Sequence, residues 1–139
     1  IGAETVRREL ADLGDGINEI DLHVNSRGGS VVEGQGIYNL LKDHPAKINS
    51  IIDGVAASTS GWICMAGDNI SIAENGYFIL HDPTNIVSGG AADLRKAADT
   101  LDETKNLIAR IFSSRTDIEA GEIEDMMLAE TWIVVYVVG

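Results

Sequence analysis

Apolar and polar positions alternate with two different periods in the first half of the chain. A strand is predicted where three apolar residues alternate with polar ones, at Ile20, Leu22 and Val24. A helix ending before Pro45 is predicted where apolar residues recur at helical spacing, at Val32, Ile37, Leu40 and Leu41. Residues 48–53 read as a second strand. The small residues from Ala56 to Ala66 predict a closely packed helix that ends at Gly67.

The rest of the chain continues the same alternation of elements. Short strands are expected over residues 70–73 and 77–81, and a long amphipathic helix over residues 91–111. Further helices are expected over residues 4–13 and 118–129, and an apolar run covers residues 133–138. Strands that alternate with helices predict an α/β fold, with a mostly parallel sheet covered by helices. A chain of 139 residues has room for one such domain, over residues 1–139.

Composition and charge exclude several classes of function. The net charge of −12 repels a phosphate backbone, so we expect no nucleic-acid partner. No apolar run approaches the roughly 20 residues that span a bilayer, and the start of the chain lacks the pattern of a secretory signal. We therefore expect a soluble, cytoplasmic protein without a membrane partner.

Cysteine and histidine usage argues against metal chemistry. Cys64 is the only cysteine, so the chain has no internal disulfide and no cysteine-based metal site, and its apolar surroundings predict a buried, inert thiol. The three histidines do not have metal-ligand spacing. Neither a dinucleotide fingerprint nor a phosphate-binding loop is present. We expect no metal and no organic cofactor.

Two glycine-bearing turns, residues 25–30 and 54–61, each follow a strand and open a helix. Backbone N–H groups at a helix N-terminus favour negative charge, and paired glycines allow a substrate to approach closely. An ordinary strand-to-helix turn would explain the first segment as well. In the second, Ser58 suits either a helix N-cap or a nucleophile.

A serine nucleophile needs a base, and histidine is the usual one. His81 is the best candidate, because it ends a predicted strand, where ligands bind in parallel sheets. His23 lies mid-strand and His44 lies at a helix end before Pro45, where structural roles suffice.

Three segments in order, residues 25–30, 54–58 and 80–83, resemble the Clp protease proteolytic subunit family, also called peptidase family S14. The similarity covers roughly residues 5–132. Residues 91–99 and 126–132 resemble the phage and prophage branch of this family, the Clp-like head maturation proteases. The resemblance implies a Clp-protease and crotonase-like fold, with ββα-type units flanked by helices. From the resemblance we expect that family sequence is lacking at both ends of the domain.

The resemblance also implies a serine endopeptidase that works through an acyl-enzyme. Ser58 matches the nucleophile, His81 the general base, and Glu130 the acid of the triad, where the family usually has aspartate. Asp82 and Asp125 are fallbacks for the acid. The oxyanion hole falls at the backbone N–H groups of Gly29 and Thr59.

The family works on protein or peptide substrates as homo-oligomeric rings, either heptamers or stacked rings, often with an AAA+ unfoldase. Two alternatives stay open: a crotonase-type acyl-CoA enzyme, and an inactive ring subunit or assembly component. The departure from the family after Trp132 makes Glu130 the least secure of the three triad assignments.

Overall fold

The computed structural model describes residues 1–134. These residues form two compact units: the second is Leu80–Thr131, and the first is the remainder of the described chain. Within the described residues, no helix is both long and apolar enough to cross a membrane. The single domain over residues 1–139 stays a prediction.

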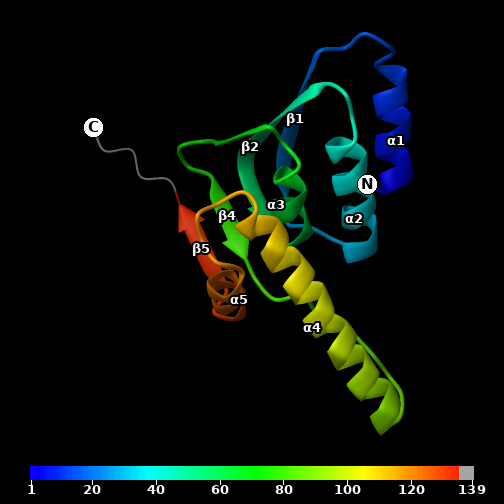
Figure 1. The fold of residues 1–139 in the computed structure, drawn as a ribbon, viewed down its shortest axis with the longest axis vertical. Helices are drawn as coiled ribbons and strands as arrows, with labels where there is room; N and C mark the ends of the chain where they lie inside the picture. Colours follow the sequence, from blue (N-terminus) through cyan, green and yellow to red (C-terminus); the bar gives the residue numbers. More distant parts are fainter. Residues whose placement is uncertain (135–139) are drawn as a thin grey trace. The chain divides into compact units, whose positions relative to one another are not determined.

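The first unit contains three helices and most of a sheet whose strands are mainly parallel (Figure 1). In chain order its elements are α1 (Ala3–Asp12), β1 (Glu19–Ser26), α2 (Val31–Lys42), β2 (Lys47–Ala57), α3 (Thr59–Cys64), β3 (Asn69–Ile72), β4 (Tyr77–Leu80) and β5 (Thr131–Val134). The last residue of β4 and the first of β5 belong to the second unit. The strand order is β1-β2-β4-β5, and β3 also pairs with β2.

Strand β2 organises this sheet because it pairs in parallel with three others. Its first half lies beside β3, from the pair Asn49–Asn69 to the pair Ile52–Ile72. Its second half lies beside β4, where Ala56 pairs with Phe78 and Ala57 with Ile79. β1 runs along its other edge. The expected α/β fold with a mostly parallel sheet is confirmed.

The core of the first unit lies between the sheet and the helices. Leu41, Ile48 and Ala66 are buried together, and partly buried apolar side chains surround them: Ile20, Leu22, Ile37, Tyr38 and Ile63. Alternate side chains of β2 point inward, including Ser50, whose hydroxyl donates to the Cys64 carbonyl at 2.9 Å. This hydrogen bond joins the middle of β2 to the last residue of α3.

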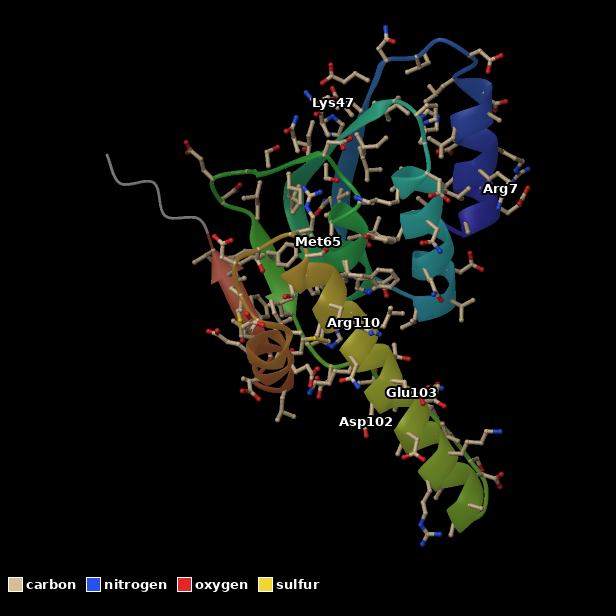
Figure 2. All side chains as sticks on the ribbon, viewed as in Figure 1. Arg7, Lys47, Met65, Asp102, Glu103 and Arg110 are labelled. Atoms are coloured by element: carbon tan, nitrogen blue, oxygen red, sulfur yellow. The ribbon has the colours of Figure 1, made fainter. Side chains whose placement is uncertain are left out.

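The second unit is helical. It consists of α4 (Ala91–Ser113) and α5 (Ala120–Leu128), preceded by the loop that leaves β4. The two helices pack on each other through buried apolar side chains: Ile108, Ala109, Phe112, Ile123 and Met127. The opposite side of α4 is exposed and charged, as Asp102, Glu103 and Arg110 show in Figure 2.

The structure differs from one expected element and describes only part of another. The helix expected from Ala56 to Ala66 is wrong at its start, because Ala56 and Ala57 continue β2 and the helix begins at Thr59. Small residues there serve close strand pairing rather than a helix. Of the apolar run at residues 133–138, the first two residues lie in β5 and the others lie outside the described residues.

Candidate active site

Ser58 has a backbone conformation that residues other than glycine rarely adopt. It stands alone between β2 and α3 with φ 55° and ψ −131°. Among the described residues other than glycine, only Ser58 and Glu130 have a positive φ. Such strain costs on the order of 1–3 kcal/mol and persists where the surrounding structure enforces it, most often at functional sites.

The Ser58 side chain does not serve as a helix cap. Although Ser58 is the residue before α3, its hydroxyl makes no capping hydrogen bond, and it is partly exposed. The neighbouring Ser60 hydroxyl binds the turn instead. It accepts from the Ala57 N–H at 3.0 Å and lies 2.8 Å from the carbonyl oxygens of Ser26 and Ala57. The turn is therefore held without the Ser58 hydroxyl.

Gly28 brings the first turn directly against the second. Its φ is 92°, and a Cβ on it would lie 2.7 Å from the Ser58 Cβ and 2.9 Å from the Thr59 nitrogen. Real Cβ atoms do not approach so closely, so this position requires glycine. The Thr59 hydroxyl adds a second link, because it donates to the Gly29 carbonyl at 2.8 Å.

The two predicted oxyanion donors lie at this junction. Within the described part of the chain, neither the Gly29 N–H nor the Thr59 N–H has a hydrogen-bond acceptor. Both residues also line a hollow of about 290 Å³, whose apolar side chains include Leu22 and Ile63. A larger hollow of about 740 Å³, between α1 and α2, is lined by none of the predicted site residues.

Cys64 lies close to this turn, and its thiol is buried. It is fully buried in α3, and its thiol donates to the Ser60 carbonyl at 3.1 Å. Burial raises the pKa of Cys64 to about 12. The predicted burial of this thiol is confirmed, and its inertness stays a prediction.

His81 lies in the second unit, directly after β4. Its Nδ1 is 2.8 Å from the Asp82 carbonyl oxygen. The Asp82 Oδ1 lies 2.9 Å from the Lys105 ammonium of α4, and both side chains of this ion pair are largely buried. Asp82, one of the fallback acids, is thus engaged through both its carbonyl and its carboxylate.

Glu130 lies in the same unit and forms the sharp turn after α5. Its φ is 53°, its N–H donates to the Met127 carbonyl at 3.1 Å, and its side chain is exposed. Glycine or asparagine usually fills this left-handed position at a helix end. No hydrogen bond joins Glu130 to His81 among the described residues. Asp125, the other fallback, is exposed on α5.

The predicted site residues divide between the units, and each half is described within its own unit. Gly29, Ser58 and Thr59 belong to the first unit, and His81 and Glu130 to the second. The other two histidines have structural partners, as expected. His23 Nδ1 lies 3.0 Å from Asp53 Oδ2, and His44 Nδ1 accepts from the Ala46 N–H at 3.1 Å.

Two groups at the site were missed by the sequence reasoning. Gly28 was seen only as one of a glycine pair, although that pairing was the available signal for a close backbone approach. Lys105 gave no signal, because nothing in a helix of mixed charge marks one lysine as the partner of Asp82. Groups of three or more side chains suited to a metal ion do not occur in residues 1–134.

The chain matches one protein-family model and is similar in sequence to several curated proteins. The Clp protease family model matches residues 3–136. The ATP-dependent Clp protease proteolytic subunit 3 of Streptomyces coelicolor is 35% identical over 101 residues, covering 70% of this chain and 46% of the relative. Subunit 1 of Streptomyces avermitilis is 31% identical, with 77% and 50% covered. The chloroplastic subunit 3 of Arabidopsis thaliana is 29% identical, with 83% and 38% covered. The chain spans half or less of the length of these three curated relatives.

Proposed function

This chain belongs to the Clp protease family, and from that premise we propose that it is a serine endopeptidase with Ser58 as its nucleophile. His81 is the general base, Glu130 is the acid of the triad, and the N–H groups of Gly29 and Thr59 form the oxyanion hole. The proposal assigns peptide-bond hydrolysis to the chain through a covalent acyl-enzyme.

The backbone of Ser58 is the observation that carries this proposal. Ser58 has φ 55° between a strand and a helix, and within the described residues its hydroxyl makes no capping hydrogen bond, so helix capping does not explain a serine at this position. Glycine would adopt the same turn without strain. A sharp strand-to-helix turn does have a chemical use, because it exposes a nucleophilic hydroxyl beside helix N–H groups.

The reaction follows from these roles. His81 takes the proton from the Ser58 hydroxyl as its oxygen attacks the scissile carbonyl carbon. The carbonyl oxygen becomes an oxyanion, which accepts hydrogen bonds from the Gly29 and Thr59 N–H groups. A single donor of this kind contributes on the order of 3 kcal/mol to transition-state stabilisation. His81 then gives its proton to the leaving amine, and a water molecule, activated by His81, releases the acid product and restores Ser58.

In this proposal the Glu130 carboxylate stabilises the positive charge that the His81 ring carries during the reaction. A carboxylate near the imidazolium stabilises it. Support comes from the strained φ of 53° at Glu130, which is the second such position in the described chain. A side chain kept where glycine is preferred suggests a role for that side chain.

The proposal extends to assembly and biological setting. The relatives bear the name of ATP-dependent proteolytic subunits, and we assign this chain to a homo-oligomeric ring in the cytoplasm that receives polypeptides from an AAA+ unfoldase. The phage-like sequences at residues 91–99 and 126–132 support a finer proposal, which is that the substrates are capsid or scaffold proteins. Mass spectrometry of a co-expressed capsid protein, with and without the active chain, tests that assignment.

Covalent labelling by a fluorophosphonate probe tests the chemistry. The wild type should be labelled at Ser58, and Ser58→Ala and His81→Ala should lose labelling, since removing a triad serine or histidine costs roughly a millionfold in turnover. Ser71→Ala is the matched control, because Ser71 is an exposed strand serine. A folded, assembled wild type that takes no label would overturn the proposal in favour of an inactive ring subunit.

A further inference from the structure

Three groups near His81 have no role in the proposed reaction: the Asp82 carbonyl, the Asp82 carboxylate and the Lys105 ammonium. The His81 Nδ1 lies 2.8 Å from the Asp82 carbonyl, and the Asp82 carboxylate lies 2.9 Å from the Lys105 ammonium. Lys105 is 23 residues further along the chain, in the middle of α4. The ion pair therefore ties the residue beside His81 to the long helix.

The first link decides which nitrogen of His81 carries the proton. A carbonyl oxygen can only accept a hydrogen bond, so Nδ1 must donate. In the neutral imidazole the other nitrogen, Nε2, is then the acceptor. A histidine that takes a proton from a serine through Nε2 needs this tautomer and not the other.

The second link fixes the direction of that carbonyl. Asp82 is followed by Pro83, and a residue before proline favours the extended backbone region over the helical one. The Lys105 ammonium pairs with the buried Oδ1 of Asp82 by charge and proximity rather than by an aligned hydrogen bond, and the exposed fractions of the Lys105 and Asp82 side chains are 17% and 34%. An ion pair with so little exposure is screened less by solvent than a surface pair.

We infer that Asp82 and Lys105 are positioning residues for His81, which hold the Asp82 carbonyl so that His81 waits with its proton on Nδ1 and its Nε2 free. This inference rests on the proposed function, because it assigns how the proposed base is prepared. It differs from the role of Glu130: the carbonyl sets the tautomer of the neutral ring, and the carboxylate stabilises the charged ring.

The tautomer can be read directly by nitrogen-15 NMR of the labelled histidines at alkaline pH, with His81→Gln to assign the resonances. The wild type should show His81 protonated on Nδ1. Lys105→Met and Asp82→Asn should both shift protonation toward Nε2 and lower the rate of fluorophosphonate labelling about tenfold. The double variant should be no worse than either single one, because both remove the same link.

Two further variants separate positioning from folding. Lys105→Arg keeps the cation, and it should restore the tautomer and most of the labelling rate. Lys96→Met is the matched control, since Lys96 is an exposed lysine of the same helix that forms no ion pair within residues 1–134, and it should change neither the tautomer nor the labelling rate. Circular dichroism identifies a variant that fails to fold, and in that event Pro83→Ala, which frees the same carbonyl by another route, takes its place.

The outcomes also distinguish this inference from the proposed function. If the wild type is labelled at Ser58 and Lys105→Met leaves both tautomer and rate unchanged, the positioning role is overturned and the peptidase assignment stands. If the wild type shows the Nδ1 tautomer and this tautomer shifts in Lys105→Met, but the wild type takes no label, the control of the His81 tautomer by the ion pair stands and the peptidase assignment fails. Nε2 protonation in the wild type refutes the inference outright.

Discussion

Gly28 lies against Ser58 so closely that a methyl group on Gly28 would be 2.7 Å from the Ser58 Cβ. The two residues are 30 positions apart, on different turns. The strained conformation of Ser58 therefore has an external support, because the backbone of one turn is pressed against the side chain of the other. That relationship leads to the first prediction.

Gly28→Ala should lower the free energy of unfolding by about 3 kcal/mol and reduce labelling of Ser58 strongly. The loss combines backbone strain at φ 92° with overpacking against Ser58 and the Ala57 carbonyl. Chemical denaturation and probe kinetics measure the two effects.

Gly14→Ala is the matched control for that variant. Gly14 also has a positive φ, of 78°, but a Cβ there would meet nothing within 4 Å. It should cost only about 1 kcal/mol, from the backbone alone, and leave labelling intact. Equal costs for the two variants would show that the approach of Gly28 to Ser58 contributes nothing.

Replacing Ser58 by glycine should make the protein more stable than replacing it by alanine. Both changes remove the proposed nucleophile, but only glycine tolerates φ 55° without strain. The expected difference in unfolding free energy is about 1 kcal/mol, after the larger entropy of the unfolded glycine chain is counted. Urea denaturation of the two inactive variants provides the comparison, and an alanine variant as stable as the glycine variant would argue against strain at this turn.

Glu130→Gln should slow labelling of Ser58 on the order of 10²-fold, while Glu130→Asp keeps most of the rate. The amide cannot stabilise the imidazolium as a carboxylate does. The His81 tautomer should not change in Glu130→Gln, because the Asp82 carbonyl sets it. Glu122→Gln, at an exposed position of α5, is the control. A fully active Glu130→Gln would remove Glu130 from the triad.

Cys64 should resist thiol reagents in the native state and react only after denaturation. Its pKa is raised by burial from 9.0 to about 12, so the thiolate is scarce at the pH of such assays. The same shift lowers stability in alkali. Between pH 9 and 12 the unfolded thiol loses its proton while the folded one keeps it, so the free energy of unfolding falls as pH rises. Reagent titration and denaturation across this range test both statements.

Much of the fold follows from local patterns in the sequence. The alternation at Ile20, Leu22 and Val24 predicted β1, and the spacing of apolar residues around Leu101 predicted α4. Periodicity succeeds here because each element buries one face. It failed at Ala56 and Ala57, where small side chains fit a helix and a tightly paired strand equally well, and only the pairing with β4 decides between them.

The candidate site was predictable as far as residue types and family order carry information. Both Ser58 and Glu130 were chosen from the sequence, and both prove to be the strained non-glycine residues of the described chain. The hydrogen bond from His81 to a main-chain carbonyl was not predictable, because every residue has such a carbonyl. The ion pair of Asp82 with Lys105 depends on how a loop returns to a helix, which composition does not encode.

The pairing of β2 with β4 has a consequence for the chain during synthesis. The turn that strains Ser58 is held where Ala56 and Ala57 meet Phe78 and Ile79, which are translated about twenty residues later. Until those residues leave the ribosome, a nascent chain can pair the end of β2 only with β1, through Ser26 and Ala56, and non-local strand pairing is slow to form. If Ser58 is the nucleophile proposed above, this order of synthesis delays its activation until β4 has joined the sheet.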